Sequence, residues 1–251
     1  MADFRQNLDQ WMEILNKLKF EIQPVAVKFL TRKPEGIDRL DRTMFFCEML
    51  KAAQEGNSFY ADQENHMCDA GLYLIGGADP PPPYTNGEYG AGLKIFNELR
   101  AARRIYQFIP KLEKGTIQYV AFSTLDRLSF EPDVLILVGN LEQTEILLRA
   151  MSYKTGKMWV SKFTSVMGCA WIFNYPYLTG ELNYAITGLG FGMKAKKVLP
   201  EGLQIISIPY DLLPSMLENL QDMPWVLPMF QPDGPEFRRQ LRIELGLDPS
   251  H

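Results

Sequence analysis

The chain has 251 residues, of which 46% are hydrophobic and 22% charged, a composition typical of a globular protein with an ordinary core. Its formal net charge of −4 argues against a nucleic-acid partner, because a polyanionic backbone requires a basic surface. The N-terminus lacks a basic segment followed by an apolar run, and no apolar stretch approaches the length of a membrane span, so we expect a cytoplasmic protein without a membrane partner.

The first part of the chain predicts two helices with a strand between them. Hydrophobic residues at spacings of three and four predict an amphipathic helix over residues 4–18. The run VAVKFL after Pro24 is rich in β-branched residues and predicts a strand. A second helix, with Cys47 on its apolar face, is expected to begin near Leu40 and to end before Gly56.

A segment rich in proline and glycine follows at residues 76–92, GGADPPPPYTNGEYGAG. Four consecutive prolines between glycines predict an irregular loop. A surface connection is one interpretation, and a lid or an oligomer contact is the other, because long loops in compact chains are often functional. We expect a single domain over residues 1–251 with two lobes, whose boundary lies near residues 78–91.

The second half of the chain predicts a helix from Leu93 to about Phe108, a strand at TIQYVAF, and further strands at NYAI and LQIISIP. The apolar run PDVLILVG is typical of a strand buried on both faces. Asn140 directly after it, with Gln143 three residues later, predicts a capping box at the start of a helix. This strand and helix form a βα unit, so we expect an α/β fold with a mixed sheet flanked by helices.

The familiar catalytic and nucleotide-binding signatures do not occur. The chain has no Walker A loop, and TGLGFG at residues 187–192 precedes no convincing helix, which favours a glycine-rich turn. A Ser/His/Asp triad is nearly excluded, because the only histidines are His66 and the terminal His251.

Three cysteines are the remaining candidates for chemistry: Cys47, Cys68 and Cys169. Each alone is compatible with a buried core residue, and no C-x-x-C pair indicates a zinc site. Small residues follow Cys68 and flank Cys169, which leaves room for a bulky group beside the sulfur atoms. If Gly71 opens a helix, the helix dipole favours the Cys68 thiolate that metals bind. His66, two residues before Cys68, is an auxiliary candidate.

The order of these segments resembles the DUF169 family of bacteria and archaea, a family of uncharacterised function often met in anaerobes. The resemblance covers roughly Pro24 to Leu220 and is carried by PVAVKF, the Cys-bearing helix, the Cys-x-x-Gly element, PDVLILVGN, Gly-Cys-Ala and the late strand ending in Ile-Pro. Members of the family commonly carry cysteine at the positions of Cys47, Cys68 and Cys169. Many read Cys-Pro-Gly-Gly from the position of Cys68, and many carry a further cysteine near Thr187-Gly188-Leu189-Gly190, where this chain has none.

Two classes of function remain open. The first is a metalloprotein in which the three cysteines hold an iron–sulfur cluster, with 4Fe-4S favoured and one iron open for redox or Lewis-acid chemistry. Zinc held by the three cysteines and His66 uses the same residues. The second class is a metal-free module that binds a small molecule or a protein, with cysteines that belong to the core. An unknown small molecule, a redox partner and a second copy of the chain are the candidate partners, and whether the chain is an enzyme stays open.

Overall fold

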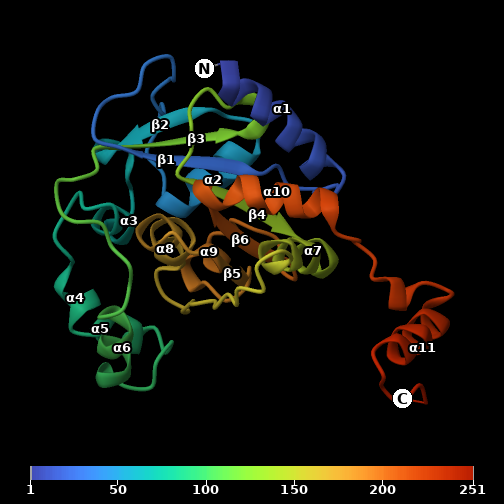
Figure 1. Ribbon diagram of the computed structural model, residues 1–251. Helices are drawn as coiled ribbons and strands as arrows, with labels where there is room; N and C mark the ends of the chain where they lie inside the picture. The colour runs from blue at the N-terminus through green and yellow to red at the C-terminus, as the bar shows by residue number, and fades with distance from the viewer. Residues whose placement is uncertain (1, 251) are drawn as a thin grey trace.

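The computed structural model describes the backbone of residues 2–250 and the side chains of residues 7–250, so the predicted first turn at Phe4 and the terminal His251 lie outside the described side chains. Six strands form one sheet in the order β2-β3-β1-β4-β6-β5 (Figure 1). Their bounds are β1 Val25–Leu30, β2 Phe59–Asp62, β3 Tyr119–Thr124, β4 Val134–Gly139, β5 Asn183–Ile186 and β6 Gln204–Pro209.

Helices cover both faces of this sheet. The longer helices are α1 Ala2–Asn16, α2 Phe46–Gln54, α6 Leu99–Tyr106, α7 Leu141–Ser152, α10 Leu213–Asp222 and α11 Gly234–Glu244. The shorter ones are α3 Asp69–Leu74, α4 Pro82–Thr85, α5 Glu88–Gly92, α8 Tyr175–Thr179 and α9 Phe191–Ala195, together with the π-helical turn η3 Ala170–Asn174 and the 3₁₀ turns η1 Gln63–Asn65, η2 Leu125–Arg127, η4 Tyr210–Leu212 and η5 Pro228–Phe230. The predicted α/β fold with helices flanking a sheet is confirmed.

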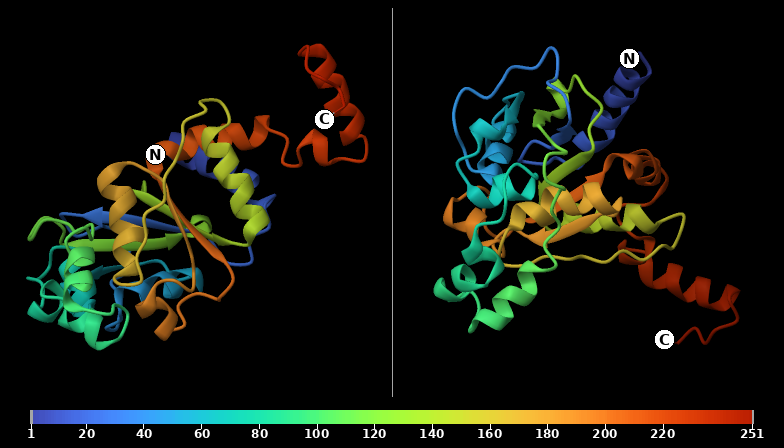
Figure 2. Two further views of the ribbon diagram at one scale, coloured as in Figure 1. Left: turned by 90° about the horizontal axis from the view of Figure 1, so that it is seen from below. Right: turned by 90° about the vertical axis from the view of Figure 1, so that its left-hand side faces the viewer.

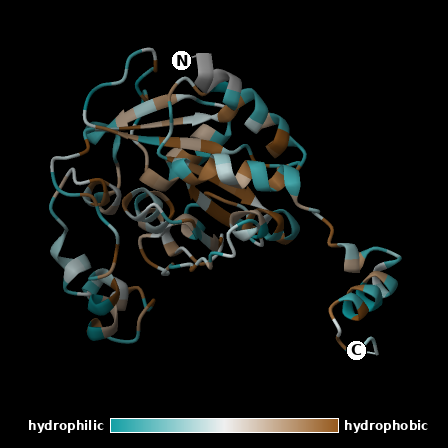
Figure 3. Cartoon of the chain, in the orientation of Figure 1, coloured by the Kyte–Doolittle hydropathy of each residue, from teal (hydrophilic) through white to brown (hydrophobic). Residues whose placement is uncertain are grey.

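The central strands send alternate side chains into two separate cores, as the two-residue period of a strand requires. Val134, Ile136 and Val138 of β4 join the core beneath α2, α3 and η3. Leu135 and Leu137 join the core beneath α1, α7 and α10. Figure 3 shows these strands as an apolar layer inside the molecule. β4 is therefore buried on both faces, as its apolar sequence predicted.

The predicted mixed sheet needs correction, because every pairing between the six strands is antiparallel. Parallel geometry within residues 2–250 is limited to two isolated bridges, Arg39 with Tyr60 and Met44 with His66. The βα unit at β4 and α7 exists, but the chain then crosses to the other face through η3 and α8 and enters β5 at the sheet edge. β6 returns beside β4 in the opposite direction, so α7 does not serve as a parallel crossover.

Several local predictions also differ from the structure, and the helix expected from Leu93 begins only at Leu99. The second helix begins at Phe46 rather than near Leu40, because the Asn65 amide donates to the carbonyls of Leu40 and Arg42 and holds that stretch as a loop. The segment over residues 76–92 contains the helices α4 and α5. Tyr84 and Tyr89 on these helices pack ring against ring, with centroids 4.7 Å apart. Aromatic packing thus stabilises turns that the proline and glycine content disfavours.

The C-terminal part leaves this body. After α10 the chain runs through η5 to α11, which stands apart from the sheet and its helices in all three views (Figures 1 and 2). Among the described residues no helix is both long and apolar enough to cross a membrane.

Candidate functional site

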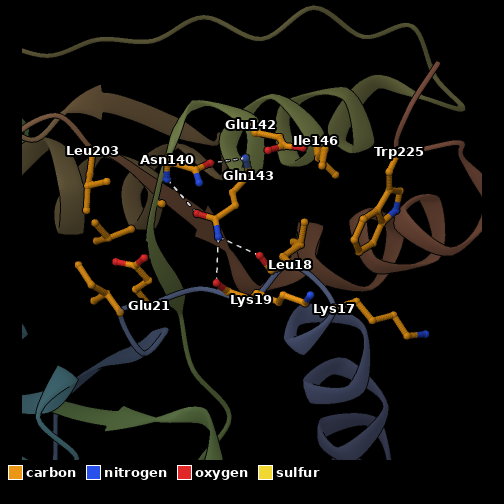
Figure 4. A pocket seen from close by; sticks show the side chains of 13 residues that line it. Lys17, Leu18, Lys19, Glu21, Asn140, Glu142, Gln143, Ile146, Leu203 and Trp225 are labelled. Carbon is orange, nitrogen blue, oxygen red and sulfur yellow. Dashed lines mark hydrogen bonds between the residues drawn. The ribbon is translucent and has the colours of Figure 1, made fainter. Parts of the chain in front are cut away.

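We compare two cavities as candidates for the functional site. The larger, about 470 Å³, lies between the end of α1 and the start of α7 (Figure 4). Its polar groups serve the fold, since Gln143 and Asn140 form the predicted capping box and the Gln143 amide also donates to the carbonyls of Leu18 and Lys19. No cysteine or histidine lines this cavity within the described part of the chain.

The second cavity, of about 210 Å³, brings all three cysteines together. Cys169 lies more than a hundred positions after Cys47 and Cys68 in sequence, but all three line this one space. Drug-sized ligands use pockets of roughly 300–1,000 Å³, so this cavity fits a smaller group. We call it the cysteine cavity.

Cys47 enters the cavity from the first turn of α2, which begins at Phe46. This helix starts where it does because Glu48 caps it: its carboxylate accepts from the Phe45 N–H at 3.1 Å. Glu48 is therefore turned to the helix end and does not line the cavity. α2 also packs on the core, where Met49 and Leu50 are fully buried in the same cluster as Cys47.

Cys68 is the N-cap residue of α3, as the small residues after it predicted. Its sulfur accepts a hydrogen bond from the Gly71 N–H at 3.3 Å. Glycine is required there, because a Cβ at position 71 would lie 2.7 Å from the Cβ of Phe46. The close approach of α3 to α2 therefore sets the position of Cys68 relative to Cys47.

Cys169 directly precedes η3, the π-helical turn that continues into α8. Two buried asparagines hold this turn in place. The Asn174 amide donates to the carbonyls of Leu74 and Pro110, and the Asn183 amide donates to the carbonyl of Trp171. Because Leu74 ends α3, the Asn174 contact joins the Cys169 element to the Cys68 element. Sequence reasoning missed both asparagines, although each stands alone in an apolar run, WIFNY and LNYAI.

All three thiols are therefore at helix starts that face one cavity, with backbone N–H groups beside each sulfur. Burial is nevertheless the larger effect on the pKa of these thiols. It raises the pKa of Cys47 to about 12, raises the pKa of Cys68, and raises the pKa of Cys169 well above its usual value. The predicted lowering of the Cys68 pKa is thus outweighed, and the N–H groups only reduce the increase.

One cation and three phenols complete the cavity wall. The Lys196 ammonium lies 3.8 Å from the centroid of the Phe45 ring, and its charge lowers the pKa of Cys68. Tyr84, Tyr89 and Tyr106 come from the helices α4 to α6, and burial raises the pKa of Tyr106 to about 12. No aspartate or glutamate of the described chain lines the cavity. Sequence reasoning missed Lys196, because nothing distinguishes this lysine from its neighbours Lys194 and Lys197 in the sequence.

The glycine-rich turn at residues 187–192 forms part of the same wall through Phe191 and Gly192. A short helix, α9, does follow it, contrary to the sequence interpretation. The turn packs against the segment of Cys169, since a Cβ at Gly168 would lie 3.6 Å from the Cα of Gly190. The glycine-rich turn is therefore beside the cavity.

His66 lies behind Cys68 rather than in the cavity wall. Its ring centroid is 5.4 Å from that of Phe46, and its Nδ1 lies 3.6 Å from the place of a Cβ on Gly71. Both ring nitrogens are buried, and neither has a hydrogen-bond partner within residues 7–250. Burial lowers the pKa of His66 to about 4, so the ring is neutral near pH 7.

The geometry does not match a site for a single ion. No group of three or more His, Cys, Asp or Glu side chains in the described residues is arranged to hold one metal ion. Ligands of a single zinc must all lie about 2.0–2.3 Å from one centre. A cluster of several iron atoms accepts thiolates that are further apart, because each thiolate binds a different iron.

Comparison with known proteins identifies the family. The sequence profile of the DUF169 family, described as uncharacterised ArCR, matches residues 13–219. The chain belongs to the DUF169 family. A relative in Methanocaldococcus jannaschii, named "Uncharacterized protein MJ0308", is 27% identical over 225 residues, which cover 87% of this chain and 94% of the relative. No solved structure matched the chain. The matched range contains the cysteine cavity and ends before α11.

Proposed function

We propose that this DUF169 protein binds an iron–sulfur cluster through Cys47, Cys68 and Cys169. The observation that carries the proposal is the convergence of all three cysteines of the chain on one cavity of about 210 Å³. Three unrelated core cysteines would have no reason to share a cavity. Thiolates are the ligands that iron–sulfur clusters take in proteins.

The surroundings of the thiols support the same proposal. Three bound thiolates bring negative charge, and the Lys196 ammonium together with the N–H groups at three helix starts offsets it. The rest of the wall is aromatic or aliphatic, which limits the access of water. Charge, hydrogen bonds to sulfur and solvent exposure are the factors that tune the potential of such a centre.

With three cysteines and no fourth thiol, one iron of a 4Fe-4S cluster lacks a protein thiolate. When bound, such a group supplies redox or Lewis-acid chemistry at that position. The chain's own contribution to this cavity is the phenols of Tyr84, Tyr89 and Tyr106, which line it together with the thiols and would orient a small ligand bound there. His66 stays behind Cys68, where its ring packs against Phe46.

A metal-free binding module is the second candidate. The aromatic side chains Phe45, Tyr84 and Phe191 in the cavity wall favour it, because apolar cavities with few polar groups are typical ligand sites. Zinc on the same thiols is the weaker alternative, because the cysteines as they stand are not arranged to hold one ion and would have to move together.

Preparation without oxygen tests the proposal. We expect a brown protein that contains iron and acid-labile sulfide, and we expect Cys47→Ser, Cys68→Ser and Cys169→Ser each to lower the iron content sharply. Gly92→Ala serves as the control, because a Cβ there meets no atom within 4 Å. A colourless protein that contains zinc points to the alternative metal, and full iron retention in all three serine variants rules out these ligands.

A further inference from the structure

The C-terminal arm, residues 226–250, is an apolar element without a partner in its own chain. Helix α11 packs against η5, and no other element of the described residues packs substantially against it. Large hydrophobic side chains of the arm are nevertheless exposed, Phe230 by 72% and Leu245 by 63%. The exposed set includes Val226, Phe230, Phe237, Leu241, Leu245 and Leu247.

The direction of the arm is fixed where it leaves the body. Arg149 on α7 donates to the carbonyls of Pro224 and Trp225, both at 2.8 Å. The Trp225 indole N–H donates back to the carbonyl of Leu220 on α10 at 2.7 Å. These contacts direct the following residues away from the sheet, as Figures 1 and 2 show. The arm is therefore an ordered projection and does not fold back on its own body.

The body carries a matching apolar groove of about 170 Å³ beside α7 and α10. Its lining includes Met151, Met158, Trp159, Val160, Leu182 and Leu212. Met158 is 87% exposed and Val160 is 61% exposed, so the apolar rim of this groove also lacks a partner. An amphipathic helix placed in an apolar groove is a common mode of protein recognition.

We propose that the arm of one chain docks in this groove of a second copy, and that the arm of the second copy docks in the groove of the first. A two-fold dimer covers the exposed arm and the exposed groove of both chains at once, because each chain contributes the same two surfaces to the interface. The apolar side chains of one arm expose on the order of several hundred Å², more than isolated monomers commonly leave in water. Two such arms, with the groove surfaces that they would cover, reach on the order of 1,000 Å², about the lower limit for a specific interface.

The charges of the arm disfavour a lipid surface as the partner. Membrane-surface helices rely on free basic residues, each worth about 1 kcal/mol near anionic lipid. Of the three arginines of α11, Arg239 binds both carboxylate oxygens of Glu236, and Arg242 donates to the carbonyl of Asp248. Residues 226–250 as a whole carry four carboxylates against these three arginines, so the arm is slightly acidic rather than basic. The proposal does not depend on the cysteine cavity.

Sedimentation velocity of the full chain over a range of protein concentrations tests the proposal. We expect the wild-type chain to sediment as a dimer. Leu241→Asp on the arm and Met158→Asp at the groove should each weaken dimer formation at least tenfold, while Gln240→Asp, the same charge change one position along α11, should retain it. None of these side chains belongs to the buried core, so the melting temperature of the body should not change.

A mixing experiment tests the reciprocal exchange. The Met158→Asp chain keeps an intact arm, and the Leu241→Asp chain keeps an intact groove. At a concentration where each variant alone is monomeric, their mixture should form heterodimers. A monomeric wild-type chain overturns the proposal, whether or not it pellets with vesicles of phosphatidylglycerol and phosphatidylcholine. So does a wild-type dimer that survives Leu241→Asp or Met158→Asp, or a mixture that stays monomeric.

Discussion

The His66 imidazole is buried without a hydrogen-bond partner for either nitrogen within residues 7–250. Such a group costs about 1–3 kcal/mol relative to a satisfied one. In metal-free protein we therefore expect His66→Phe to raise the free energy of unfolding by about 1 kcal/mol, because a ring of similar shape replaces the polar one beside Phe46. Urea unfolding measures the change, with His66→Asn as the polar control. A loss of stability in the phenylalanine variant would show that the ring has a partner.

The ion pair between Asp62 and Arg39 is expected to weaken in acid. A hydrogen bond from the Arg39 guanidinium at 2.7 Å is the main cause that lowers the pKa of this carboxyl below its usual value. The unfolded chain then binds more protons in acid than the folded chain. The stabilisation is therefore fully present above the unfolded pKa and is lost as pH falls through the folded pKa.

Asp62→Asn tests this contact, because asparagine can still accept from the Glu64 N–H at the N-cap of η1 but carries no charge. We expect the variant to melt below the wild-type chain at neutral pH and the difference to shrink as the solution is acidified below about pH 4. The guanidinium is partly exposed, so added salt should also reduce the difference. A difference that is constant with pH would assign the effect to packing. Glu64→Gln is the control on the neighbouring carboxylate.

At the scale of elements, the contact between α2 and α3 decides the geometry of the cysteine cavity. A methyl group at Gly71 would lie 2.7 Å from the Cβ of Phe46, inside van der Waals contact. Gly71→Ala should therefore force the helices apart, lower the free energy of unfolding by about 1–3 kcal/mol, and reduce the iron content. Gly92→Ala, in the open end of α5, should leave both unchanged or raise stability slightly. Unaltered stability and iron in Gly71→Ala would contradict this account.

Sequence reasoning succeeded for elements whose pattern is local. The strands β1 and β4 and the capping box at Asn140 follow from short runs of residues, and they lie where the patterns placed them. The shared cavity of the cysteines follows from small neighbours and family resemblance, whereas the distances within it depend on the contacts of Gly71 and Asn174. The predicted direction of the strands was wrong. An antiparallel strand is also buried on both faces when helices cover both faces of its sheet, so an apolar run does not indicate parallel pairing.

The predicted start of α2 was also wrong, because a contact distant in sequence decides it. Leu40 and Met44 have helical spacing with Cys47, and local propensity favours a helix through all of them. Asn65 lies more than twenty residues further on, and its side-chain amide donates hydrogen bonds to the carbonyls of Leu40 and Arg42. A buried tertiary contact thus outweighs the local preference, and nothing in the local pattern reveals it.

At the scale of the whole molecule, the cysteine cavity joins three elements of one face of the sheet: α2, α3 and η3. A group that binds the folded chain and not the unfolded chain stabilises it by mass action. If the proposed cluster is present, its removal with a chelator should lower the melting temperature by several degrees, since about 1 kcal/mol corresponds to roughly 2–4 °C at this chain length. Calorimetry with and without chelator measures the change.

The matched control is Cys68→Ser, which should melt at the temperature of the chelated wild type and should not respond to chelator. A wild-type chain that contains iron and melts at the same temperature after its removal would place the metal outside the folded core.

The position of β1 in the sheet has a consequence for synthesis on the ribosome. Val25 pairs with Thr124 of β3 on one side and with Ile136 of β4 on the other. About a hundred further residues must therefore be translated before the central strand finds a neighbour, which takes roughly 5–20 s at 5–20 residues per second. During this interval the apolar run VAVKFL and the thiols of Cys47 and Cys68 are exposed to chaperones and to oxidants. Cys169 leaves the ribosome later still, so any group that requires all three thiols can be inserted only after β1, β3 and β4 have all been synthesised.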